Sequence, residues 1–136
     1  MANIYNLFKF LEDKEGTKTP FMAKLIYSPD NLTPDELEVG GALYLRNTKI
    51  TSLPDGLKLG GGLYLRSTKI TSLPDGLEVG WNLELRDTPI TSLPDGLEVG
   101  GYLDLRNTPL SEKYTEEEIR KMIEDKGGEV KGAIFT

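Results

Sequence analysis

The sequence of 136 residues contains neither cysteine nor histidine. Without cysteine there is no disulfide framework, no thiol nucleophile and no thiolate metal site. Without histidine the chain also lacks the commonest general base and the commonest metal ligand. The hydroxyl groups that remain have no evident base beside them to activate a nucleophile. We therefore expect no enzymatic activity and no cofactor.

Positive charge and long apolar runs are also scarce. Acidic residues outnumber basic ones 22 to 16, which gives a formal net charge of −6. An acidic chain is a poor candidate for binding nucleic acid or an anionic membrane surface. No stretch approaches the ~20 apolar residues of a membrane span, and residues 1–16 form no signal-peptide core. We expect a soluble, cytoplasmic protein with no nucleic-acid or membrane partner.

The chain does contain a ten-residue motif that recurs every 20 residues. Residues 71–80 and 91–100 both read TSLPDGLEVG, and residues 51–60 read TSLPDGLKLG. A fixed period of this length indicates a solenoid, in which each unit buries its apolar face against its neighbours. Alignment of the chain on itself gives four units, 33–52, 53–72, 73–92 and 93–112.

Each unit contains one L-x-L segment, in which two leucines flank a polar or aromatic residue. This alternation is typical of a β-strand. We expect the four strands to pair in parallel, about 4.8 Å apart, with the leucines facing inward. Two further apolar ladders are predicted to fill the interior from the return side of each coil: Leu37, Leu57, Leu77 and Leu97, and Ile50, Ile70, Ile90 and Leu110.

Turn residues separate these apolar positions. In L-P-D-G we predict a β-turn with proline second, aspartate third and glycine fourth. The glycine pairs at 40–41, 60–61 and 100–101 are interpreted as a sharp backbone corner before the strand. No unit has room for a long helix, so the return side is expected to be extended or turn-like.

The unit resembles the shortest, bacterial type of leucine-rich repeat. Residues 91–110, TSLPDGLEVGGYLDLRNTPL, carry the T-x-L-P opening and the L-x-L strand of that family, and the resemblance covers residues 33–112. It implies an α/β repeat solenoid, a short leucine-rich-repeat stack with a parallel β-sheet on its concave face. The family's ladder asparagine is replaced by threonine, a ladder that we interpret as structural: Thr48, Thr68, Thr88 and Thr108.

The same family includes secreted bacterial effectors and many small proteins of phages and gut bacteria. The effectors carry a ligase domain with a cysteine nucleophile after their repeats. This sequence has no cysteine, so the resemblance does not imply that activity.

An open stack exposes its core and its strand edges at both ends, so caps are expected. For residues 113–136 we predict a helix followed by a closing strand. Thr115 and Glu118 form a capping box at the start of the helix, and Gly127 ends it. Residues 130–135 are predicted to be the strand.

Residues 1–32 are predicted to form a helical N-terminal cap. One helical face contains Ile4, Leu7, Phe8 and Leu11. A second short helix is predicted to start at Thr19–Pro20. Residues 23–28 are then expected to form a degenerate strand, because Leu25 lies 20 residues before Leu45.

The polar positions of the L-x-L strands are expected to line the concave face and to bind a partner. Arginine follows the second leucine in every unit, at Arg46, Arg66, Arg86 and Arg106. The positions between the leucines are Tyr44, Tyr64, Glu84 and Asp104, and the positions just before the strands include Tyr102 and the only tryptophan, Trp81. We expect Trp81 to be exposed as a contact anchor, although burial in a widened coil is the alternative.

Four stacked guanidinium groups repel one another, and two interpretations account for them. In the first, Glu84, Asp87 and Asp104 neutralise them locally. This fits the second half of the array and fits the first half poorly, where tyrosines stand beside the arginines. In the second, an arginine–tyrosine corner receives the carboxylates or phosphates of a partner.

Three functional hypotheses follow. The first is a non-enzymatic protein–protein binding module, and the phage resemblance suggests an inhibitor or decoy of a host protein. The second is a binder of a small phosphorylated ligand, such as a nucleotide, at the corner formed by Arg46, Arg66, Tyr44 and Tyr64. The third is self-association of an otherwise monomeric chain through an incompletely capped end.

A calcium site is the remaining alternative for the acidic turns. Asp35, Asp55, Asp75 and Asp95 recur at one position of the repeat and could supply oxygen ligands. Their spacing matches no recognised calcium loop. We therefore expect no metal.

Overall fold

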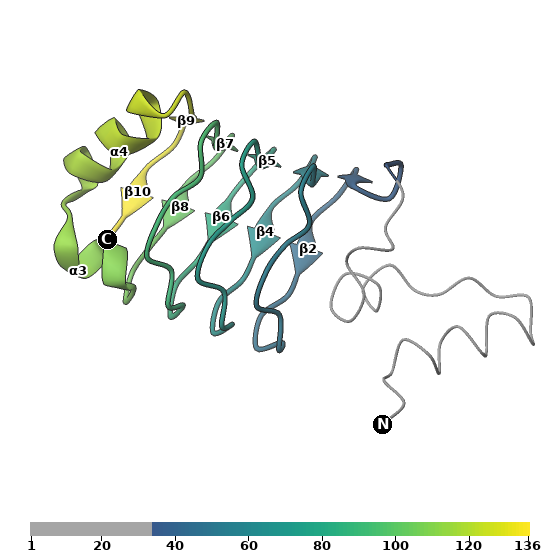
Figure 1. Cartoon of the computed structure of the whole chain (residues 1–136), viewed down its shortest axis with the longest axis horizontal. Coiled ribbons are helices and arrows are strands. Elements are labelled where there is room, and N and C mark those ends of the chain that lie inside the picture. The colour runs from purple at the N-terminus through teal and green to yellow at the C-terminus, as the bar shows by residue number, and fades with distance from the viewer. Residues whose placement is uncertain (1–33) are drawn as a thin grey trace, which may run out of the picture.

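The structure is a computed structural model, and it describes residues 34–136. The helices and the strand predicted within residues 1–33 lie outside the described residues. The described part is a β-solenoid whose coils lie side by side along the long axis (Figure 1). Each coil contributes one two-residue strand to each of two parallel sheets.

The first sheet contains the predicted L-x-L strands. Its order is β10-β8-β6-β4-β2, and every pairing is parallel. Like positions stand side by side, so that Leu43 pairs with Leu63 and Leu83 with Leu103. The strands are β2 (Leu43–Tyr44), β4 (Leu63–Tyr64), β6 (Leu83–Glu84), β8 (Leu103–Asp104) and β10 (Ile134–Phe135). The predicted strands, pairing and register are confirmed.

A second parallel sheet was not predicted. Its order is β1-β3-β5-β7-β9, and it lies on the side that we expected to be mostly extended or turn-like, where the extended segments of neighbouring coils pair. In each of its strands a charged residue is followed by an apolar one. The strands are β1 (Glu38–Val39), β3 (Lys58–Leu59), β5 (Glu78–Val79), β7 (Glu98–Val99) and β9 (Glu129–Val130).

The core lies between the two sheets. Leu63, Leu65, Leu83 and Leu85 have no exposed surface, and each fully buried leucine contributes about 1.5–3 kcal/mol. The predicted ladders are buried as expected, except that Leu37, at the N-terminal end of the described part, is half-buried. The buried ladder residues are Leu57, Leu77, Leu97, Ile50, Ile70, Ile90 and Leu110.

The predicted β-turns at P-D-G are present, but each begins at the proline, one residue later than predicted. The amide of Leu77 donates to the carbonyl of Pro74 at 3.3 Å, so proline is the first residue of the turn and glycine the third. Gly76 has φ = 74°, in the left-handed region that a third turn position of this kind requires. The predicted placement of proline at the second position is therefore wrong.

The backbone bends at the glycine pairs before the strands, as predicted, but the reason for glycine at these positions differs from the one expected. A Cβ on Gly80 would overlap the carbonyl oxygen of Gly60, and one on Gly100 would overlap that of Gly80. None of these glycines has a positive φ. From the second coil onward they are required because successive coils approach closely, and not because the corner needs an unusual backbone conformation. An added Cβ on Gly40 or Gly41, in the first coil, would meet nothing within 4 Å.

The C-terminal helix begins and ends where the sequence predicts. It is α4 (Glu116–Asp125), with Thr115 and Glu118 forming the capping box. Gly127, with φ = 79°, follows its end. A short helix that was not predicted, α3 (Pro109–Lys113), precedes it and is capped by Thr108.

The single closing strand predicted at residues 130–135 is instead two strands. β9 pairs with β7 and β10 pairs with β8, so both sheets gain a fifth strand. Residues 127–135 (GGEVKGAIF) therefore take the place of residues 96–104 (GLEVGGYLD) in a fifth, degenerate coil. The shared Gly, Glu-Val and Gly positions were the signal in the sequence that this coil existed.

Arg120 of α4 binds the outer edge of β9. Its Nη1 and Nη2 donate to the carbonyls of Val130 and Gly132 at 2.7 and 2.8 Å. An edge strand presents unpaired carbonyls on which another chain can pair. Arg120 occupies two of these acceptors.

Candidate functional site

The candidate site is the exposed face of the β2–β10 sheet. Four of its five strands, β2, β4, β6 and β8, lead into a Leu-Arg-x-Thr turn. In each turn the threonine hydroxyl donates to the leucine carbonyl three residues earlier, at 2.7–2.8 Å. The predicted threonine ladder is thus structural. The residue between arginine and threonine has φ between 57° and 61° in all four turns, a conformation that asparagine and aspartate tolerate best.

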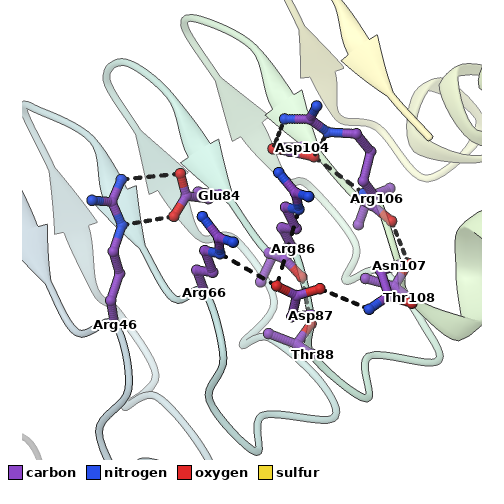
Figure 2. A network of polar contacts seen from close by, with 12 residues as sticks. Arg46, Arg66, Glu84, Arg86, Asp87, Thr88, Asp104, Arg106, Asn107 and Thr108 are labelled. Atoms are coloured by element: carbon purple, nitrogen blue, oxygen red, sulfur yellow. Dashed lines mark hydrogen bonds and ion pairs between the residues drawn. The ribbon is translucent and has the colours of Figure 1, made fainter.

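These turns align the four arginines, here called the arginine strip: Arg46, Arg66, Arg86 and Arg106 (Figure 2). Glu84, Asp87 and Asp104 lie among them. Acidic and arginine side chains are therefore interleaved along the strip, and the pairing differs from one arginine to the next.

Arg46 is paired with an acid two coils away. Its Nε and Nη2 donate to the two carboxylate oxygens of Glu84, at 2.7 and 3.0 Å. Its guanidinium also lies 4.9 Å from the ring centroid of Tyr64, which is stacked on Tyr44. The expectation that the first half of the array has no acid for its arginines is therefore wrong.

Asp104 lies beneath Arg106. The carboxylate accepts hydrogen bonds from Nε and Nη2 of Arg106 at 2.9 and 2.8 Å and from the Arg106 amide at 3.1 Å. Burial favours the neutral acid, but these bonds and the charges of Arg106 and Arg86 outweigh it, so the pKa of Asp104 is lowered. Asp104 is therefore an ionised carboxylate that orients Arg106.

Asp87 lies between the two middle arginines of the strip, Arg66 and Arg86. It accepts a hydrogen bond from Nδ2 of Asn107 at 2.7 Å and one from Nε of Arg66 at 3.3 Å. The bond from Asn107 is the main reason that the pKa of Asp87 is lowered, and Arg66 and Arg86 add to it despite an opposing effect of desolvation.

Arg86 differs from the other three arginines. Its Nε is buried and has no hydrogen-bond partner, and the nearest carboxylate oxygen, on Asp87, is 4.0 Å away. Its side chain is nevertheless 38% exposed. Among the residues that the structure describes, Arg86 is thus the one member of the strip without a hydrogen-bonded acid.

The acids of this face are less exposed than the arginines. Side-chain exposure is 12% for Glu84 and 4% for Asp104, whereas it is 47% for Arg46 and 50% for Arg106. Four arginines and three acids leave a net charge of +1 on the strip. What faces solvent is therefore mainly guanidinium, held in place by carboxylates underneath.

Aromatic side chains occur in the same coils as the strip. Tyr44 and Trp81 are 67% and 60% exposed, so the expected exposure of Trp81 is confirmed. Tyr64 is buried, and Tyr102 is half-buried with a ring centroid 5.5 Å from that of Phe135. Phe135, which lies 5.5 Å from the guanidinium of Arg106, was not predicted as a site residue because its coil was not recognised in the sequence.

The β1–β9 sheet carries a separate open groove of about 610 Å³. It is lined by the glycines that follow the strands of this sheet and by charged side chains that include Lys58, Glu78 and Glu98. In residues 34–136 no group of three or more acidic side chains is placed to hold a metal ion. Nor does the described part of the chain include a helix long and apolar enough to cross a membrane.

Comparison with known proteins identifies no relative. No family model matches the chain, and neither a curated protein nor a solved structure matches it.

Proposed function

We propose that this protein is a non-enzymatic binding module that holds another protein on the face of the β2–β10 sheet. The observation that carries the proposal is the exposure of Trp81, which precedes β6 in the same coil as Arg86 of the ordered arginine strip. Tryptophan, tyrosine and arginine are the residues that most often dominate protein–protein binding energy. A tryptophan that is 60% exposed contributes little to the core and is available to a partner.

The ion pairs of the strip support the same proposal. An unrestrained arginine side chain on a protein surface loses conformational entropy when a partner immobilises it, and this loss reduces the binding affinity. Glu84 and Asp104 already hold Arg46 and Arg106 in one orientation. The face is therefore preorganised for binding.

The finer assignment rests on the resemblance of the repeat. We propose that the solenoid is a short leucine-rich-repeat stack, in which this face is the concave one. Residues 113–136 would cap it, with Ile119 and Ile123 of α4 buried against the last coil. A phage or bacterial inhibitor or decoy of a host protein is the corresponding role, and the resemblance is its only support.

The second hypothesis, a small phosphorylated ligand at the first-half corner, has less support. Arg46 is bound to Glu84 through two hydrogen bonds, and the ring of Tyr64 is buried. Arg66 also donates a hydrogen bond, to Asp87, so only Tyr44 of that corner remains for a ligand. A nucleotide binder would gain thermal stability with millimolar nucleotide by mass action, and we expect no such gain.

The proposal is tested by quantitative co-purification from cells that naturally make the protein. The baits are the wild type, Trp81→Ala and a matched control, Glu98→Ala, which changes an exposed residue of the opposite sheet. We expect one or more proteins recovered with wild type and control to fall at least tenfold with Trp81→Ala. Equal recovery by all three baits would exclude this face as the binding surface.

A further inference from the structure

We infer that Arg86 is the anchor of this face and that it binds a carboxylate of the partner protein, from an Asp or Glu side chain. The inference deepens the proposed function and rests on it, because it names the chemistry that the same face recognises. It starts from the one departure from regularity in the strip.

The other three arginines already have acids. Arg46 donates to Glu84, Arg66 to Asp87 and Arg106 to Asp104. Asp87 also accepts from Asn107, so its oxygens are engaged on both sides. Arg86 is left with a carboxylate oxygen at 4.0 Å and no hydrogen bond.

The Nε–H of Arg86 is the second observation. It is buried without an acceptor, an arrangement that is unfavourable in any folded protein. The side chain is 38% exposed, and the inference requires it to turn so that Nε faces a group above the sheet. A carboxylate placed there would accept two parallel hydrogen bonds from the guanidinium and give Nε the partner that it lacks.

The charge of the strip selects the class of anion. Three acids offset three of the four arginines, so a ligand meets one uncompensated positive charge. A carboxylate carries a single negative charge and matches it. A phosphate group at neutral pH carries up to two and would meet Asp87 and Asp104 nearby without a second free arginine.

The third coil also carries the aromatic contact. Trp81 and Arg86 flank β6, five residues apart in sequence and therefore at most about 18 Å apart. A partner segment lying along β6 can contact both. We therefore expect an acidic residue near one end of that segment and an apolar group near the other.

The test uses the full chain labelled with ¹⁵N-arginine, whose Nε–Hε signals report on each arginine separately. Sodium acetate replaces sodium chloride at constant ionic strength, and Arg86→Lys assigns the Arg86 signal. We expect the shift of the Arg86 signal to be at least threefold larger than those of Arg46 and Arg106. Equal shifts at all three would overturn the inference. The shifts are measured on the wild type, and the variant serves only to assign the Arg86 signal, which requires that its other signals keep their wild-type positions.

Inorganic phosphate provides the second arm of the titration. A larger shift of Arg86 with phosphate than with acetate would overturn the carboxylate assignment. Loss of this inference would leave the proposed function intact if Trp81→Ala still reduced partner recovery. If acetate shifted the Arg86 signal but Trp81→Ala left partner recovery unchanged, the anion site at Arg86 would be supported. The proposed protein-binding face would then be contradicted.

Discussion

Arg46 and Glu84 are 38 residues apart in sequence and form a two-pronged ion pair across an intervening strand. β2 and β6 are not neighbours, since β4 lies between them. The guanidinium spans β4 while remaining 4.9 Å from the ring of Tyr64. The pair therefore links three consecutive coils.

We predict that this pair stabilises the stack measurably. A double-mutant cycle with Arg46→Ala and Glu84→Gln should give a coupling energy of about 1 kcal/mol in urea unfolding. The value is modest because Arg46 is about half exposed and water screens its charge. A coupling near zero would mean that the pair does not persist in solution.

Leu65→Asp should abolish folding. Leu65 has no exposed surface in the middle of the array, and the variant would bury a charge without a partner. Circular dichroism checks the loss of β-structure. Lys69→Asp, an exposed change in the same coil, should stay within about 0.5 kcal/mol of wild type. A folded Leu65→Asp protein would contradict the proposed core.

Gly80→Ala should destabilise the solenoid by about 1–3 kcal/mol, because the new Cβ would overlap the carbonyl of Gly60. Gly40→Ala is the matched control. It changes the same repeat position in the first coil, where nothing lies within 4 Å of an added Cβ. Thermal unfolding of both variants measures the difference. Equal stability would show that the coils are not stacked this closely.

Acid should weaken the protein partly through Asp104. Its folded pKa is lowered from an ordinary value of about 3.9, so its charge stabilises the folded state above that value. The contribution is lost as pH falls through the folded pKa. Asp104→Asn should therefore lose less stability than wild type between pH 6 and pH 3, whereas Glu98→Gln should follow wild type. Identical acid profiles for Asp104→Asn and wild type would contradict the pairing with Arg106.

Asp75→Ser should change stability by less than about 1 kcal/mol, with or without calcium. The Asp75 side chain is exposed and accepts one hydrogen bond, from the Asp95 amide at 3.0 Å. A serine oxygen can replace part of that bond. Differential scanning calorimetry in calcium and in chelator checks the prediction. A loss that appears only in calcium would restore the metal hypothesis.

The sequence was sufficient for the register of the first sheet because its repeat has no insertions. With leucines at every twentieth position, a slip of one residue would turn Leu63 and Leu83 toward solvent. The second sheet could not be predicted, since a two-residue strand such as Glu78–Val79 is too short to show a period. Pairing with the neighbouring coils determines it.

The candidate site was predictable in outline only. The row of arginines was evident from the sequence. The acidic residue with which each arginine pairs was not, because the pairing depends on how far the arginine side chain extends. An extended arginine can pass one whole strand, about 4.8 Å wide, and still meet a carboxylate on the next. Arg46 therefore finds Glu84, whereas Arg86 remains without a hydrogen-bonded acid in the same array.

Both the proposed binding face and the position of Arg86 on it depend on the alignment of equivalent residues across the coils. Scalar couplings across hydrogen bonds, from amide nitrogen to carbonyl carbon, test this directly by NMR. We predict couplings from Leu43 to Gly62, from Leu63 to Asn82 and from Leu83 to Tyr102, and also from Leu103 to Ala133 in the fifth coil. Couplings that join these leucines to other residues, or that are absent in the folded protein, would contradict the alignment of the arginine strip.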